Sequence, residues 1–434
     1  MHSTVASALE VPVATEKKET FGFAYWCLAF FTFMLFVAPQ TIFGFLAPLH
    51  LAKVSMILAL VVYSHQKLSK HENFFPHSPA VPLLGLFVLL CALSIPFSLW
   101  PAGSLGLLSG DYLKSLVFFL LIAQLLSSLA AFNRMIWYML ICCFIVALTA
   151  IAGYQQGNLV GGYRMQGAGG GLTSNPNDFA LTINLMVPFA FALYSLGGKP
   201  IKKAFCIAFI VLAVAAIMLT YSRAGIITLI IVLALSFWKM VKQGQRMKYV
   251  LPFVLVIGVF ALLSPDKYLE TLQTITDPSK DATGSSVARQ DAMSAALEVI
   301  TEHPLLGVGI GMNILALNEK GLYWAQVHNV YLQIASDVGL PALVVFLVVI
   351  VKTFKSLRKI ERDFRQDKEQ RELVVLTGAA ETSLLAFCIA ALFHPVAYHF
   401  YFYYIAGFAI ALIAIAERTK GDTITSDQAR VWMK

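Results

Sequence analysis

Residues 203–240 read KAFCIAFIVLAVAAIMLTYSRAGIITLIIVLALSFWKM, two apolar runs separated by the five residues YSRAG at 221–225. The runs 203–219 and 224–240 each approach the roughly 20 residues that an α-helix needs to cross about 30 Å of hydrocarbon. The connection between them is long enough only for a turn. The stretch therefore predicts two antiparallel membrane-spanning helices.

Similar apolar runs recur along the whole chain. Of its 434 residues, 58% are hydrophobic and only 13% are charged, a balance typical of polytopic membrane proteins. No series of alternating ten-residue segments indicates a β-barrel. The predicted fold class is all-α, a single integral membrane domain over residues 1–434 with about twelve transmembrane helices. The predicted spans are 22–38, 47–64, 80–99, 111–130, 135–153, 178–196, 203–219, 224–240, 249–264, 328–351, 373–394 and 399–416.

The basic residues fall mainly on one side of these predicted helices. Threading the chain through a membrane places 24 of the 32 Lys and Arg residues on that side. Short loops rich in Lys and Arg remain in the cytoplasm, so both termini are predicted to be cytoplasmic. The net charge of +8 then reflects membrane orientation, and nucleic acid is not an expected partner.

Two segments on the other side are unusually long. Residues 154–177 form a glycine-rich loop, whose backbone N–H groups can approach a ligand closely. Residues 265–327 form a second, larger loop with a helical stretch at 287–301. This loop predicts a helical cap over one end of the bundle.

Four basic side chains stand out because they fall on the outer side or beside a helix end there. They are Arg164, Arg223, Arg289 and His328. Taken singly, an arginine there can extend to lipid phosphate, and a lone histidine at a helix end is commonly structural. Taken together, planar guanidinium groups suit a diphosphate, and an imidazole titrating near neutral pH suits a general base. We therefore predict a site that binds a diphosphate and performs acid–base chemistry.

The cysteines do not indicate a metal site. All six lie inside hydrophobic runs without CxxC or Cys/His spacing, so they are predicted to be small buried apolar residues. They are Cys27, Cys91, Cys142, Cys143, Cys206 and Cys388.

Several of these segments resemble the O-antigen ligase and O-antigen polymerase superfamily, which includes bacterial protein O-oligosaccharyltransferases. The resemblance rests on YSRAG, on HPLLGVGIGM at 303–312 and on HNVYLQIASDVGLP at 328–341. YRMQG at 163–167 and NPND at 175–178 add weaker support. The direct resemblance covers about the central half of the chain.

The resemblance implies a metal-independent, inverting glycosyl transfer that uses no cofactor. The donor would be a glycan linked to undecaprenyl diphosphate in the bacterial inner membrane, with the active site, both long loops and the cap facing the periplasm. His328 would be the catalytic base, Arg164 and Arg223 would hold the diphosphate, and Arg289 would be a further anion contact. Possible sugar-binding or orienting residues are Asn175, Asn177, Asn329 and Tyr331, although helix capping explains Asn177 or Asp178 about as well.

Three acceptors remain open within this superfamily. A ligase would use the lipid A core, a polymerase a second glycan, and a protein glycosylase a serine; we favour the ligase. The alternative from another class is a secondary transporter, although no internal symmetry supports it. Glu381 and Asp337 lie within predicted spans, where ionisable groups are either functional or part of a buried hydrogen-bonded pair.

Overall fold

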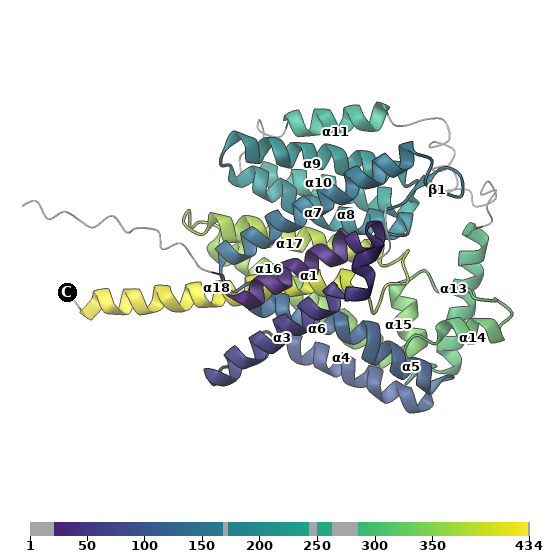
Figure 1. Cartoon of the computed structure of the whole chain (residues 1–434). Coiled ribbons are helices and arrows are strands. Elements are labelled where there is room, and N and C mark those ends of the chain that lie inside the picture. The colour runs from purple at the N-terminus through teal and green to yellow at the C-terminus, as the bar shows by residue number, and fades with distance from the viewer. Residues whose placement is uncertain (1–20, 168–171, 243–249, 263–284, 433–434) are drawn as a thin grey trace, which may run out of the picture.

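The computed structural model describes residues 21–167, 172–242, 250–262 and 285–432, and these residues form a helical bundle (Figure 1). The first half contains α1 (Phe23–Phe36), α2 (Pro39–Ile42), η1 (Gly44–Leu49), α3 (Leu51–Ser69), α4 (Ala80–Ser94), η2 (Ile95–Phe97), α5 (Pro101–Leu107), η3 (Leu108–Tyr112), α6 (Leu113–Leu125), α7 (Leu129–Gln155), β1 (Leu159–Val160) and β2 (Arg164–Met165). The second half contains α8 (Pro176–Leu196), α9 (Pro200–Leu219), α10 (Arg223–Lys242), α11 (Val250–Leu262), α13 (Ser285–Glu302), α14 (Asn313–Glu319), α15 (Val330–Val338), α16 (Leu340–Phe364), α17 (Arg371–Ala390) and α18 (Phe400–Trp432).

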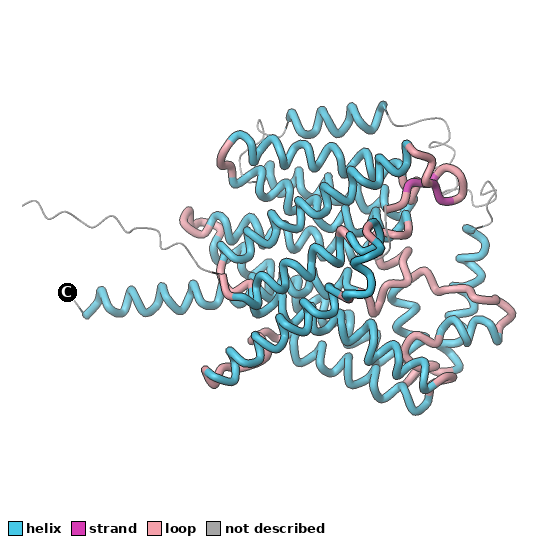
Figure 2. The backbone as a smooth tube through the Cα atoms, in the orientation of Figure 1, coloured by secondary structure: helices cyan, strands magenta, loops and turns pink. Residues whose placement is uncertain are grey.

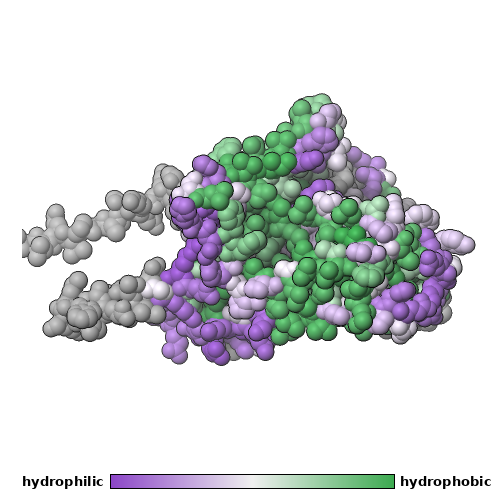
Figure 3. Space-filling model, turned by 90° about the horizontal axis from the view of Figure 1, so that it is seen from below, coloured by the Kyte–Doolittle hydropathy of each residue, from purple (hydrophilic) through white to green (hydrophobic). Residues whose placement is uncertain are grey.

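The helical fold class is confirmed, and the chain is a multi-pass membrane protein. Ten helices of the described residues are long and apolar enough to cross a membrane, and each overlaps one of the twelve predicted spans. A predominantly hydrophobic surface separates two more polar ends (Figure 3). The predicted span 22–38 contains α1, which has only 14 residues, and 249–264 is described only as α11, which has 13.

The short length of α1 has a local cause. The helix ends before Ala38, whose φ of 48° lies in the left-handed region, and Pro39 then begins α2. Proline removes a backbone donor and disfavours helix in the residue before it, so the chain cannot continue as one rod.

The predicted continuous span 328–351 is wrong, because the chain breaks at Gly339. Its φ is 95°, and a Cβ there would lie 2.2 Å from the carbonyl oxygen of Leu305. Glycine alone fits this close approach without strain. The short helix α15 therefore precedes the break, and the membrane-length helix α16 follows it.

The centre of the bundle is formed by α8, α17 and α18, which are buried along most of their apolar lengths. Helix α8 packs on α17, α9 and α10, while α18 packs on α6 and α16 packs on α4. The backbone drawn as a tube in the same orientation shows these helices side by side across the bundle (Figure 2).

One end of the bundle carries additional helices. The predicted helical stretch 287–301 is confirmed as α13, which packs against α14 and α15 (Figure 1). Small apolar side chains, including Ala292 and Ala296, form the contact with Leu317 and Val327. We call this the His328 end; α18 extends from the opposite end of the bundle.

Candidate active site

Arg164 is held between two parts of the chain that are far apart in sequence. A two-residue antiparallel pairing of β1 and β2 places it opposite Val160. Its Nε donates to the carbonyl oxygen of Thr220 at 2.9 Å, and its Nη2 donates to Oδ1 of Asn177 at 2.8 Å. Burial lowers the pKa of Arg164, and the positive charge of Arg223 lowers it further. The guanidinium group remains a cation, because arginine is not deprotonated in proteins.

Arg223 lies close to Arg164 because the YSRAG turn is fixed by side-chain hydrogen bonds. Ser222 accepts a hydrogen bond from the Gly225 N–H at 3.2 Å and donates one to Asn177 Oδ1 at 2.8 Å. Helix α10 begins at Arg223 itself, whose side chain is half-buried. The structure therefore brings two of the predicted arginines together.

Asn175 and Asn177 have different structural roles. Asn175 caps α8, since its Oδ1 accepts from the backbone N–H of Asn177 at 2.8 Å. The capping role that the sequence left open for Asn177 or Asp178 therefore belongs to Asn175. The Asn177 side chain instead accepts from both Arg164 and Ser222, and so orients the first arginine.

His328 directly precedes the N-cap of α15. Asn329 is that cap, with Oδ1 accepting from the backbone N–H groups of Tyr331 at 2.9 Å and Leu332 at 3.2 Å. The Val330 N–H donates to the carbonyl oxygen of Ala391 at 2.7 Å, which fixes the start of this helix against the end of α17. His328 is thus held in position by the backbone on its C-terminal side.

The acid–base character of His328 differs from the sequence prediction of a group titrating near neutral pH. Burial, the largest cause, together with the charges of Arg289 and His394 lowers the pKa of His328 from 6.5 to about 4. The imidazole is therefore neutral at pH 7 and has a free lone pair to accept a proton. It is a weaker base than an exposed histidine.

Arg289 links the added helices to this site. It lies half-buried on α13, and its charge lowers the pKa of both His328 and His394. The structure thus places Arg289 beside the histidines.

His394 is a residue that the sequence interpretation missed. It is fully buried in the segment after α17, with Nδ1 2.8 Å from the carbonyl oxygen of Ala390 and Nε2 3.2 Å from that of Asn177. Burial lowers its pKa. The predicted span 373–394 had placed His394 inside a helix, but α17 ends at Ala390. The proline that follows it, Pro395, was the sequence signal that His394 lies outside a helix.

These contacts connect the four predicted residues. Asn177 holds Arg164 with its side chain and lies against His394 with its backbone, while Arg289 acts on His394 and His328. Arg223 joins the group through its effect on Arg164.

Three other predicted residues serve as anchors or lie elsewhere. The Tyr331 hydroxyl donates to the carbonyl oxygen of Cys388 at 2.8 Å, so it fastens α15 to α17. Buried Asp337 accepts from the backbone and side-chain amides of Asn313 at 2.7 and 2.9 Å, and from Tyr398 at 3.1 Å. Glu381 belongs to an ion-pair network with Lys239 on another part of the bundle.

The cysteines match their prediction as apolar residues. Five of them are buried and Cys388 is half-buried, and all six are free thiols. Within the described ranges, His, Cys, Asp and Glu side chains form no cluster of three that could hold a metal ion.

The fold and the site define a polytopic helical membrane protein with clustered guanidinium groups and a neutral imidazole at one end. Residues 208–347 match the family model described as O-Antigen ligase. This match supports the resemblance to the O-antigen ligase superfamily that the sequence motifs predicted. Members of this family are membrane glycosyltransferase-like enzymes, and the family implies lipid-linked glycan substrates. The matched region contains Arg223, Arg289 and His328, while Arg164 lies before it.

One solved structure, described as "Structural coordination of polymerization and crosslinking by a peptidoglycan synthase complex", contains a chain with 18% sequence identity and a TM-score of 0.42. The alignment covers 78% of this chain and 96% of that one. This likeness is too weak to carry an argument about fold or function. No curated protein matches the chain.

Proposed function

We propose that the protein is an O-antigen ligase-type glycosyltransferase, which moves a glycan from undecaprenyl diphosphate to a hydroxyl of the lipid A core. The observation that carries the proposal is the Asn177 junction, which joins Arg164 to His394, whose charge acts on His328 at the same end of the bundle. A diphosphate leaving group needs fixed cations, and a hydroxyl acceptor needs a proton acceptor.

In the proposed reaction, the acceptor hydroxyl gives its proton to a ring nitrogen of His328 as its oxygen attacks the anomeric carbon. The bond between that carbon and the diphosphate oxygen breaks with inversion, and the electron pair leaves with undecaprenyl diphosphate. Negative charge grows on the departing oxygen, where the guanidinium groups of Arg164 and Arg223 stabilise it. This chemistry uses charged side chains of the chain itself and assigns no step to a metal or cofactor.

The low pKa of free His328 fits this proposal when the donor is considered. Burial and the charges of Arg289 and His394 oppose a positive imidazole in the free protein. A bound diphosphate brings opposite charge, which favours the protonated form and raises the pKa. His328 would therefore become a stronger base when donor is present.

The proposed orientation places the His328 end in the periplasm. It rests on the concentration of Lys and Arg in segments at the other end, including the α16–α17 connection. The glycine-rich loop 154–177 and the large loop 265–327 would then be periplasmic, and both termini cytoplasmic, in the bacterial inner membrane.

The test uses the purified full chain with an undecaprenyl-diphosphate-linked glycan and three separate acceptors: lipid A core, a second donor molecule and a serine-bearing protein. Release of undecaprenyl diphosphate with glycosylated lipid A core is the expected result. Product from the second donor would identify a polymerase, and glycosylated serine a protein glycosylase. Uptake into vesicles without product would indicate a transporter instead.

His328→Ala should bind the donor and transfer almost none of it, a loss on the order of 10²–10⁴ in rate. The matched control is His303→Ala, because His303 is an exposed histidine in the segment that follows α13 at the same end. Normal transfer by His328→Ala would reject His328 as the base.

A further inference from the structure

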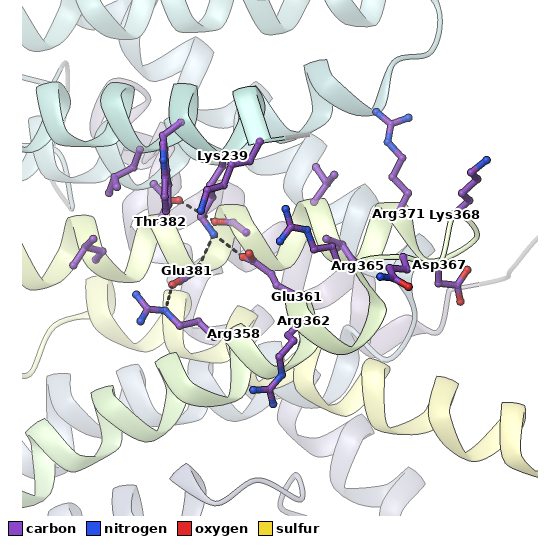
Figure 4. A pocket seen from close by; sticks show the side chains of 18 residues that line it. Lys239, Arg358, Glu361, Arg362, Arg365, Asp367, Lys368, Arg371, Glu381 and Thr382 are labelled. Atoms are coloured by element: carbon purple, nitrogen blue, oxygen red, sulfur yellow. Dashed lines mark hydrogen bonds and ion pairs between the residues drawn. The ribbon is translucent and has the colours of Figure 1, made fainter. Parts of the chain in front are cut away.

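A cavity of about 680 Å³ lies far from His328, between α10, α16 and α17 (Figure 4). Helix α10 begins at Arg223 in the candidate active site and ends at Lys242 in this cavity. At 1.5 Å per residue, its 20 residues span on the order of 30 Å. The two sites therefore lie near opposite ends of the bundle.

The inner part of the cavity is an ion-pair network. Lys239 Nζ lies 2.6 Å from Glu361 and 2.5 Å from Glu381, and Arg358 Nε lies 2.6 Å from the other oxygen of Glu381 (Figure 4). A Cβ on Gly378 would meet Glu361 at 3.1 Å, so this glycine leaves room for the pair. Both inner carboxylates are thus neutralised by the cations beside them.

The rim carries the remaining charge. The lining contains seven Lys or Arg side chains but only three Asp or Glu, and two of those acids belong to the inner network. Arg365 and Lys368 are exposed on the α16–α17 side, and neither has an ion-pair partner in the described part of the chain. The cavity mouth is therefore strongly cationic.

The cavity lining also includes apolar side chains from α10 and α17. They are Leu235, Trp238, Val374 and Leu385. Trp238 is 52% exposed, and Lys242 Nζ lies 3.7 Å from the centre of its ring. Tryptophan and lysine are common where a membrane helix reaches the lipid headgroups.

We propose that this cavity binds an anionic phospholipid of the surrounding membrane. The headgroup phosphate lies among Arg365, Lys368 and Lys242, and the adjoining acyl segment lies along Trp238 and Leu235. Basic cavities between transmembrane helices are suited to anionic headgroups. The volume is in the usual range for small-molecule sites, about 300–1,000 Å³. The apolar side chains in the lining favour a lipid over a soluble anion, and the inference does not depend on the proposed glycosyl transfer.

The test measures lipid retention by native mass spectrometry of the full chain in detergent, with phosphatidylglycerol and phosphatidylcholine offered in equal amounts. The intact protein should retain phosphatidylglycerol preferentially. Arg365→Ala combined with Lys368→Ala should lower its affinity by about tenfold or more, because each cation near an anionic headgroup contributes about fivefold. Exchanging the two residues, Arg365→Lys with Lys368→Arg, should preserve binding.

The matched control is Lys355→Ala with Lys359→Ala, which removes two exposed cations from the preceding helix, α16, outside the cavity lining. This pair should retain phosphatidylglycerol. An equal loss of phosphatidylglycerol retention in both double variants would show that general surface charge, and not this cavity, binds the lipid. Displacement of the lipid by equimolar inorganic pyrophosphate would overturn the lipid assignment in favour of a soluble anion.

Discussion

The Nε2 atom of His394 lies 3.2 Å from the carbonyl oxygen of Asn177, so the segment after α17 meets the first turn of α8. The other ring nitrogen faces the Ala390 carbonyl oxygen at 2.8 Å. A neutral imidazole carries one N–H and can donate to only one of these two acceptors at a time. The low pKa of His394 therefore leaves one of its two nitrogens facing a carbonyl without a proton to share.

Asn177→Ala should weaken donor binding by about tenfold or more, since a hydrogen bond to a charged group contributes about 1.5–3 kcal/mol. The substitution removes the oxygen that receives Arg164 Nη2 and leaves only the contact with Thr220. Donor affinity, measured by titration, checks the effect. Asn175→Ala is the control: losing this helix cap should cost about 1 kcal/mol of stability while donor affinity is kept. Equal donor affinities in the two variants would contradict the orienting role of Asn177.

Arg223→Ala should lower the transfer rate by about a hundredfold, the usual loss for one preorganised contact with developing charge. Arg223→Lys should recover only part of it, because an ammonium group cannot reproduce the planar two-bond contact. Rates with saturating donor check both variants. Full activity of Arg223→Ala would instead favour an arginine that contacts only membrane phosphate.

The pH dependence of transfer should report the lowered pKa of His328. The base must be neutral, so kcat/KM should stay level from pH 7 downward and fall as the pH approaches about 4, rather than near 6.5. Because kcat reports the donor-bound protein, its acidic limb should lie at higher pH. Arg289→Gln removes a positive charge beside the imidazole and should shift the kcat/KM limb upward. If the acidic limb of kcat/KM is unchanged in Arg289→Gln, Arg289 does not lie close to His328.

The same shift has a consequence for folding. The folded pKa of His328 is below the unfolded value of 6.5, so the unfolded chain binds more protons between about pH 4 and 6.5. The contribution of this group to stability therefore falls as the pH decreases through that window.

Asp337→Ala should destabilise the protein by about 3 kcal/mol, because it leaves the Asn313 amides and the Tyr398 hydroxyl without their buried acceptor. Thermal unfolding in detergent checks this expectation. Asp291→Ala, on the exposed face of α13, is the control and should change stability by less than about 0.5 kcal/mol. Equal melting temperatures for the two variants would contradict the anchoring role of Asp337.

Much of the fold could be predicted because apolar run length directly reflects membrane thickness. The same approach failed at Gly339, where the helix is interrupted by the approach of Leu305 from a distant part of the chain. The periodicity of residues 328–351 contains no sign of that contact. Local pattern thus predicted the helices but not a break imposed by tertiary packing.

The candidate site was predicted from charge that the membrane orientation did not explain, and the structure brings Arg164 and Arg223 together as expected. His394 was missed because its position inside a predicted span concealed it. The low pKa of His328 was also missed, since it depends on burial and on Arg289 from another helix. The residue type shows that His328 can act as a base, whereas the surrounding residues determine its pKa.

Because the helix is interrupted at Gly339, the position of His328 does not depend on the length of the membrane-spanning helix α16. The far end of α15 is gripped by residues 304–309: Leu340 N–H bonds to Pro304, Val308 N–H to Ser336 and Gly309 N–H to Asp337, at 2.8–2.9 Å. The height of the imidazole relative to the membrane is consequently set by a stretch of irregular backbone and not by a membrane-spanning helix. Substitutions in residues 304–309 should therefore change the rate of the proposed transfer even though these residues do not contact the sugar.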